Sequence, residues 1–222
     1  MKFKNIQEES FEKFPTVLTP ELVVGNIPKF KEPKIIRNWL LWLEQRSTED
    51  GRSTILIRPW GCKNYLPQEL TPFPINVKSR LHGYGGAPFS IAYAGNQLFL
   101  TWINDIDGCL WLQKWSGLNF ALIDEHPQLK KDGNALCLSK AGEYNLADGL
   151  IDLTRERWLG VMEERNKDYL VSFELKEELQ KPKILYEPKD FIGYLAINKT
   201  SQKLVWVEWN QPYMPWDSSY LK

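Results

Sequence analysis

The sequence predicts an all-β fold: a partial β-propeller of antiparallel sheets, with three blades and part of a fourth. Two observations predict it. Aromatic residues make up 13% of the chain, including ten tryptophans, and aromatic side chains favour strands and fill large cores. In addition, a two-strand unit recurs along the chain. With 222 residues, the chain is long enough to bury a substantial core.

Each recurring unit begins with an apolar run that ends in a polar residue, then continues through a polar turn into a second apolar run. The first runs lie at 40–44, 98–104, 158–163 and 204–208, and the second at 54–58, 109–113, 169–173 and 220–222. The mean repeat of roughly 55 residues is close to that of known propeller blades, with some loop insertion. Continuous apolar runs are typical of strands covered on both faces by neighbouring blades. The alternative is a β-sandwich with irregularly spaced strands.

These units place blades near 35–75, 87–135, 147–187 and 190–222, within one incomplete domain that spans 1–222. Helix signals are short. Thr19-Pro20 before an apolar stretch and Gly25 predicts one capped turn, and 175–181 before Pro182 predicts another. Because a propeller closes its ring to protect its sheet edges, we expect a truncated chain whose open blade edges favour self-association.

Composition argues against several classes of partner. The chain carries 28 basic and 28 acidic residues, so no net charge favours nucleic acid or an anionic membrane. It has no apolar stretch long enough to span a bilayer and no signal peptide in its first residues, which predicts a cytoplasmic protein.

The three cysteines, Cys62, Cys109 and Cys137, form no metal-binding or redox motif. We expect them to be buried, reduced thiols.

One segment resembles a known family. Residues 77–86, V-K-S-R-L-H-G-Y-G-G, are similar to the V-R-S-R-V-H-E-Y-G-G stretch of dipeptidyl- and acylaminoacyl-peptidases of the prolyl oligopeptidase family. Gly83 stands where the family usually has glutamate, so any role of that carboxylate is missing from this chain. Further segments resemble the family in the same order along the chain, at 19–23, 42–44, 51–56, 69–72, 147–149 and 205–217.

The resemblance implies a function for the whole protein. In this family a propeller precedes an α/β-hydrolase domain with a Ser-Asp-His triad, caps the active site and admits only short peptides. The resemblance therefore implies an α/β-hydrolase domain as the partner and short peptides as substrates of the intact enzyme. That catalytic domain is absent from these 222 residues.

The sequence contains no machinery for acyl transfer. A nucleophile elbow has the pattern G-x-S-x-G, and Ser53, which follows Gly51-Arg52, lacks the closing glycine. Of the two histidines, His126 precedes Pro127 in a polar loop and is expected to be solvated, and His82 is more consistent with a hydrogen bond to a backbone carbonyl than with a catalytic base. We therefore predict no catalytic, cofactor-binding or metal-binding residues, and expect this chain to be inactive alone; whether the protein is an enzyme stays open.

Two glycine-containing motifs are interpreted as structural and not as ligand-binding. The segment 83–86 fits neither a dinucleotide fingerprint nor a P-loop, and its glycines predict a tight passage between blades. The segment 105–108, D-I-D-G, imitates part of a calcium loop, but the first and twelfth positions would be Ile103 and Lys114, which are not suitable ligands. It predicts a turn. Asn198-Lys199-Thr200 matches the glycosylation pattern by chance, since no secretory signal is present.

Two groups of side chains remain as candidates. The pair Glu163-Glu164 could hold a substrate ammonium, or be a solvated strand end. The aromatic cluster could line a peptide path or pack within a blade; its members are Trp206, Trp209, Tyr213 and Trp216. We favour the structural interpretation for both groups.

Three functional hypotheses follow. The first is a non-catalytic gating propeller segment of a cytoplasmic serine oligopeptidase. The second is a stand-alone binding or scaffold module that closes its ring by oligomerisation. The third is an independent propeller enzyme such as a glycosidase, for which the sequence supplies no convergent pair of acids.

Overall fold

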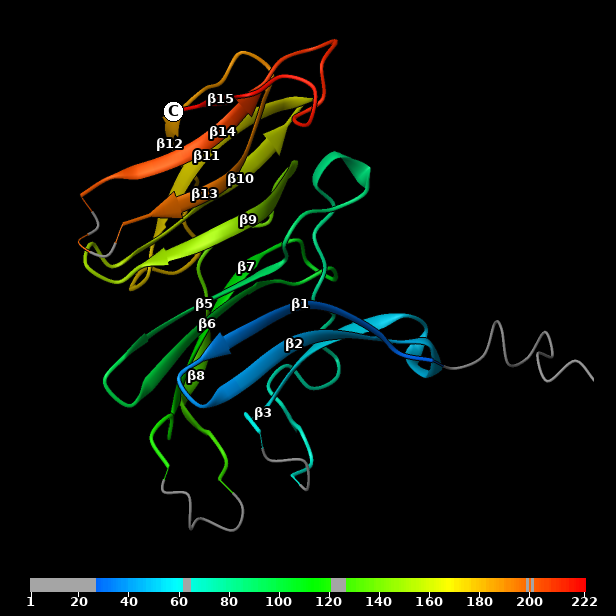
Figure 1. Ribbon diagram of the computed structural model, residues 1–222, viewed down its shortest axis with the longest axis vertical. Helices are drawn as coiled ribbons and strands as arrows, with labels where there is room; N and C mark the ends of the chain where they lie inside the picture. The colour runs from blue at the N-terminus through cyan, green and yellow to red at the C-terminus, as the bar shows by residue number, and fades with distance from the viewer. Residues whose placement is uncertain (1–26, 62–64, 121–126, 199, 201) are drawn as a thin grey trace, which may run out of the picture.

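A computed structural model describes residues 27–61, 65–120, 127–198, 200 and 202–222 of the chain. Within these ranges the protein is all-β, with no α-helix, and its four antiparallel sheets are arranged as a propeller (Figure 1). The predicted fold class is confirmed. The turn predicted near Thr19 lies outside the described residues. Residues 175–176 form a turn and 178–179 a bend, and Gln180 makes a bridge with Ser139.

Each sheet is built from strands that follow one another in sequence. The strands are β1 (Lys29–Ile36), β2 (Trp39–Arg46), β3 (Arg52–Pro59) and β4 (Gln68–Glu69); β5 (Phe89–Ala94), β6 (Gln97–Ile103), β7 (Leu110–Ser116) and β8 (Lys130–Cys137); β9 (Tyr144–Asp152), β10 (Arg157–Glu164), β11 (Lys167–Glu174) and β12 (Lys183–Tyr186); and β13 (Phe191–Ile197), β14 (Leu204–Trp209) and β15 (Tyr220–Leu221). Two 3-10 turns, η2 (Ser47–Glu49) and η3 (Leu81–Gly83), interrupt them. The short loops between successive strands produce up-and-down sheets, as expected for propeller blades.

The recurring apolar runs of the sequence fall on the second and third strands of each sheet. β10 shows why these runs are nearly continuous: five successive residues from Trp158 to Met162 are buried, so both faces of the strand are covered. β1, β8 and β12 are more exposed. β8, for example, is exposed from Lys130 to Asn134. The second and third strands therefore make the interior of each blade.

The hydrophobic core lies between neighbouring blades. One cluster joins the first two sheets, a second joins the second and third, and a smaller third joins the last two. In the first cluster, Trp39 is fully buried, donates its indole N–H to the carbonyl of Leu118 at 2.9 Å and meets Phe120 edge-on. Such packing holds each blade against the next, since blades share no backbone ladder.

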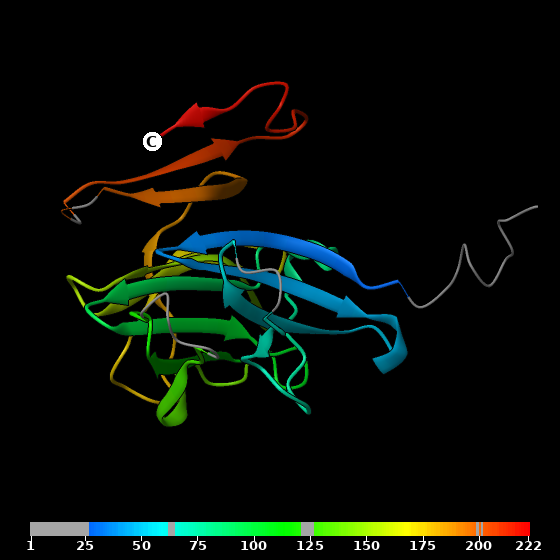
Figure 2. The ribbon, with the colours of Figure 1, turned by 60° about the horizontal axis from the view of Figure 1, so that its bottom comes forward.

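The first strands of the sheets face one another near the centre of the molecule. β5 packs against β9, and β9 against β13. Figure 2 shows β1 and β5 side by side, with the fourth sheet, in orange and red, displaced to one side of them. No helix in the described ranges has the length and apolar character to cross a membrane. The central strands carry the cavity described below.

Candidate functional site

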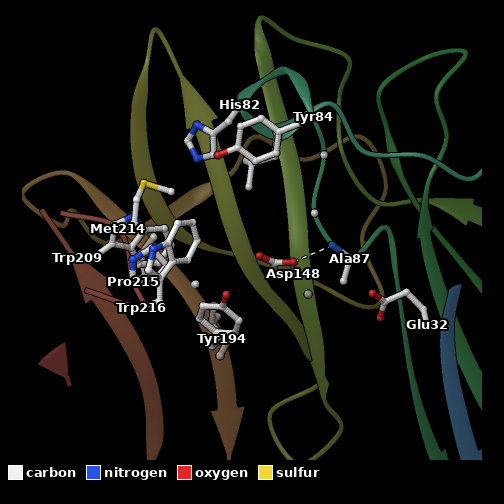
Figure 3. A pocket seen from close by; sticks show the side chains of 17 residues that line it. Glu32, His82, Tyr84, Ala87, Asp148, Tyr194, Trp209, Met214, Pro215 and Trp216 are labelled. Atoms are coloured by element: carbon white, nitrogen blue, oxygen red, sulfur yellow. Dashed lines mark hydrogen bonds between the residues drawn. The ribbon is translucent and has the colours of Figure 1, made fainter. Parts of the chain in front are cut away.

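A cavity of about 820 Å³ opens where the first strands β1, β9 and β13 converge (Figure 3). Its walls also include the segment from Leu81 to Ala87, which leads into β5, and the segment after β14. Residues of all four sheets or their connections therefore meet there. The cavity is of the size that proteins use for small-molecule and peptide ligands.

Asp148 of β9 supplies a carboxylate in the middle of the cavity. Its Oδ1 accepts the backbone N–H of Ala87 at 2.7 Å, and the Asp148 N–H donates to the carbonyl of Ala87 at 3.0 Å. This reciprocal pair fixes the carboxylate and leaves Oδ2 facing Gly193 across the cavity. Burial raises the pKa of Asp148, and the nearby carboxylates of Glu32 and Asp168 add to the shift, while the backbone hydrogen bond and His82 oppose it.

Glycines bring the connecting segment close to β9. Gly85 has a φ of +89°, and a Cβ there would lie 2.8 Å from the carbonyl oxygen of Ser79. At Gly86, a Cβ would lie 2.7 Å from the Cβ of Ala147 and 2.9 Å from Asp148 Oδ1. Both positions therefore require glycine. The predicted tight passage between blades is present, and it also forms a wall of the cavity.

An aromatic wall faces the carboxylate. The indole of Trp209 stacks on Phe191 with ring centroids 5.7 Å apart, and Tyr194 lies beside it at 6.3 Å. Trp216 and Tyr84, 76% and 83% exposed, complete the rim of the cavity (Figure 3). Large exposed aromatic side chains that surround one cavity are typical of a binding surface.

His82 anchors the glycine-containing segment to the third sheet. Its backbone N–H donates to Glu163 Oε2 at 2.6 Å, and its ring places Nδ1 3.7 Å from Glu163 Oε1 and Nε2 3.2 Å from Asp168 Oδ1. The side chain of Asp168 is 1% exposed, and its Oδ1 meets no other donor among the described residues. The nearby Asp168 carboxylate raises the pKa of His82, aided by the charges of Glu163 and Asp148, while burial of the ring opposes the shift. A backbone carbonyl was the expected partner of His82, and the structure instead places its ring against the carboxylates of Glu163 and Asp168.

The raised pKa of His82 predicts a pH-dependent contribution to stability. Because the folded protein favours the protonated ring, the contribution is complete below the unfolded pKa of about 6.5 and is lost as the pH rises through the higher folded pKa. We expect the difference in unfolding free energy between wild type and His82→Gln to be largest below about pH 6 and to shrink as the pH rises and the His82 imidazole loses its proton. Urea unfolding at several pH values measures it. A difference that is constant or grows with pH would contradict this role.

The candidate pair Glu163 and Glu164 does not form a common site. Glu163 is occupied by His82 and by Asn145, whose Nδ2 donates to it at 3.3 Å, so it anchors the loop and does not line the cavity. Glu164 ends β10, where it pairs in register with Tyr144 and Lys167. The paired carboxylates thus contribute no joint site.

Of the aromatic cluster, two members line the cavity and two do not. Trp209 and Trp216 belong to its wall, whereas Trp206 packs on Tyr186 at 5.2 Å and donates to Glu208. Tyr213 is 56% exposed and lies outside the lining. Packing within the blade thus applies to Trp206, whereas Trp209 and Trp216 face the cavity.

The remaining motifs serve the fold. Residues 105–107 form a turn; Asp105 is paired with Arg80 at 2.6 Å, and Asp107 accepts the N–H of Cys109 at 2.8 Å. Cys109 and Cys137 are free thiols, and burial raises the pKa of Cys137 to about 12, so it is a poor nucleophile. Cys62 and His126 lie outside the described residues. Across the described residues, no group of three or more His, Cys, Asp or Glu side chains has a geometry that could hold a metal ion.

Sequence reasoning did not identify Glu32, Asp148, Tyr84 or Tyr194 as cavity residues. One signal was present: Asp148 and Gly149 interrupt the apolar segment that runs from Leu146 to Ile151. A carboxylate inside a central strand is costly to bury and therefore marks a site. Nothing in the spacing indicated that β1, β9 and β13 would bring these residues together.

The fold matches solved structures of peptidases. A puromycin-hydrolysing peptidase of Mycobacterium tuberculosis superposes with a TM-score of 0.69 and 19% identity, over 87% of this chain and 30% of that one. A puromycin hydrolase superposes with a TM-score of 0.70 and 18% identity, over 92% of this chain and 32% of that one. The fold of this chain is similar to that of the matching part of these peptidases.

The match covers only part of those peptidases. This chain spans about a third of their length and is similar to the N-terminal part, the propeller. No family model and no curated protein matches the sequence. At this level of identity the likeness concerns the fold.

Proposed function

We propose that this chain is the non-catalytic, substrate-gating propeller segment of a serine oligopeptidase of the cytoplasm. The observation that supports it best is the fold likeness, which extends over 87–92% of this chain but only 30–32% of the peptidases. An α/β-hydrolase domain in the same polypeptide would then perform peptide hydrolysis. The motifs that resemble the prolyl oligopeptidase family, in order from 19 to 217, agree with this proposal.

The cavity gives the gating role a physical basis. Its walls are central strands and connections of the blades, so a peptide that passes along the inner strands would meet Asp148 and the rings of Trp209 and Trp216. A cavity of about 820 Å³ can hold a short peptide segment but not a folded protein. This chain would bind peptides and exclude folded proteins. The hydrolase domain would cleave the peptide bond.

The test uses the native polypeptide that carries this segment, purified with an antibody raised to it. We expect the purified protein to release fluorophores from short peptide conjugates and to lose at least about tenfold of this activity after treatment with a fluorophosphonate, which modifies activated serines. A control antibody raised to an unrelated protein should recover no such activity. Purified polypeptide without fluorophosphonate-sensitive hydrolysis would contradict the proposal.

A second candidate, a scaffold that closes by pairing with another copy, is favoured by one observation. β15 forms the edge of the three-stranded sheet and exposes Leu221 at 75% and Tyr220 at 55%. An exposed apolar edge strand is a template for pairing with another chain. This candidate predicts a native oligomer without hydrolase activity, and the same purification distinguishes the two.

A further inference from the structure

One buried carboxylate joins two parts of the cavity wall that are far apart in sequence. The side chain of Asp168, at the start of β11, is 1% exposed. Its Oδ2 accepts the backbone N–H of Ile192 at 3.1 Å, and its Oδ1 lies 3.2 Å from Nε2 of His82. Ile192 belongs to β13 and His82 to the segment 81–87, and both residues line the cavity. Asp168 therefore connects the segment to β13.

The ring of His82 needs a proton on both nitrogens to serve both of its acidic neighbours. Nε2 faces Asp168 Oδ1 at 3.2 Å, and Nδ1 faces Glu163 Oε1 at 3.7 Å. A protonated imidazole has an N–H donor on each nitrogen, whereas a neutral imidazole has one donor and one lone pair. The neutral ring can therefore donate to only one of the two carboxylates, and it presents its lone pair to the other.

Acidic side chains from three strands surround this imidazole. Asp168 of β11 raises its pKa most, Glu163 of β10 and Asp148 of β9 add to the shift, and burial opposes it. β13 contributes the uncharged ring of Phe191, which meets the imidazole edge-on with centroids 5.4 Å apart. Tyr84 of the same segment lies at 6.1 Å, and Figure 3 shows both rings above the carboxylate of Asp148. The surroundings thus favour the charged ring.

The segment 81–87 is strained at the residue that anchors it. His82 has a φ of +51°, a left-handed conformation that side chains other than glycine rarely adopt. Such a conformation persists only where surrounding contacts hold it. Arg80, just before the segment, is held at 2.6 Å by Asp105. Beyond that point the contacts of His82 are its two ring neighbours and the bond from its backbone N–H to Glu163 Oε2 at 2.6 Å.

We propose that His82, Glu163 and Asp168 form a proton-controlled clasp that holds the segment 81–87 against the rest of the cavity wall. The protonated ring bridges the two carboxylates and fixes the segment beside β13. Loss of the proton removes one of the two ring contacts, so the strained segment opens more often and exposes this side of the cavity to solvent. The clasp requires neither a ligand nor a hydrolase domain, and it therefore goes beyond the proposed function.

The test measures hydrogen exchange by mass spectrometry on the whole polypeptide that carries this chain, at about pH 6 and about pH 8.5. Exchange times are scaled for the intrinsic pH dependence of amide exchange. The closed segment binds the proton more tightly than the open one, so its protection is complete below the unfolded pKa of about 6.5 and is lost as the pH rises. We expect the protection of 81–87 to fall by at least about threefold, since each pKa unit between the two states changes the opening equilibrium tenfold.

An internal control separates local opening from loosening of the whole fold. β6 lies in the core of the second sheet and has no contact with His82, so its protection should change by less than about twofold over the same pH range. A fall of equal size in β6 and in 81–87 would mean that the whole propeller loosens, and would overturn the proposed clasp.

Variants test which groups control the opening. His82→Gln can donate to one carboxylate but does not titrate, so 81–87 should be less protected at about pH 6 and should differ by less than about twofold between the two pH values. Asp168→Asn keeps an oxygen for the Ile192 N–H and should reduce the pH dependence. Glu164→Gln alters the neighbouring carboxylate of β10 and should behave as wild type. Equal protection of wild-type 81–87 at both pH values, or an undiminished pH dependence in folded His82→Gln, would overturn the proposal.

Discussion

Replacing Trp158 with alanine is expected to lower the free energy of unfolding by about 3–5 kcal/mol, because a large buried ring would be lost from the core. Trp158 is 1% exposed and lies in the core between the second and third sheets, with its ring 5.9 Å from that of Phe173. Its indole covers Gly149 and Gly160, where an added Cβ would overlap the ring. Alanine would leave a cavity that these rigid strands cannot close.

The matched control is another tryptophan. Trp216 is 76% exposed at the rim of the cavity, so Trp216→Ala should change the unfolding free energy by no more than about 0.5 kcal/mol. Chemical denaturation of both variants measures the difference. Similar losses of stability in the two would show that the blade interfaces are not packed as described.

Arg52→Ala is expected to cost about 2–4 kcal/mol, because several charge-assisted hydrogen bonds would be lost together. Arg52 is 7% exposed and begins β3. It donates to the carbonyls of Thr71 and Ile75 at 3.1 and 3.0 Å, and pairs with Glu69 at 2.7 Å and Glu49 at 2.5 Å. It thereby holds the segment that leads from the first sheet to the second.

Two further variants make this prediction specific. Arg52→Lys keeps the charge but not the planar fork of donors, so it should recover only part of the stability. Lys176→Ala removes an exposed pair with Glu156 and should change stability by no more than about 0.5 kcal/mol. Thermal or urea unfolding ranks the three variants. Full recovery by lysine would show that charge alone, without the fork geometry, holds the segment.

The interiors of the blades were predictable from sequence, and their inner and outer edges were not. β6 and β10 are largely covered on both faces, so their sequences are continuous apolar runs that repeat visibly. β1 is different: it is exposed over most of its length, with a register shift between Lys31 and Lys34. Such a strand is paired through its backbone, which leaves little trace in hydrophobic patterning.

The cavity was less predictable than the fold, because it assembles from segments that are far apart in sequence. Glu32 and Trp216 both line it, although nearly the whole chain separates them. For His82 a backbone carbonyl was the expected partner, and its carboxylate neighbours Glu163 and Asp168 could not be identified without the packing of the third sheet. Asp148, an acid within an apolar strand, was the one local signal of a site.

The most direct test of the account measures two properties of the native polypeptide that carries this segment: its mass, and whether a fluorophosphonate labels it. An antibody raised to residues of this chain and the label should detect the same band, well above 26.0 kDa, because the hydrolase domain would belong to the same polypeptide. Coincident bands at the larger mass would support a gating propeller within a serine oligopeptidase. An unlabelled band at 26.0 kDa would contradict it.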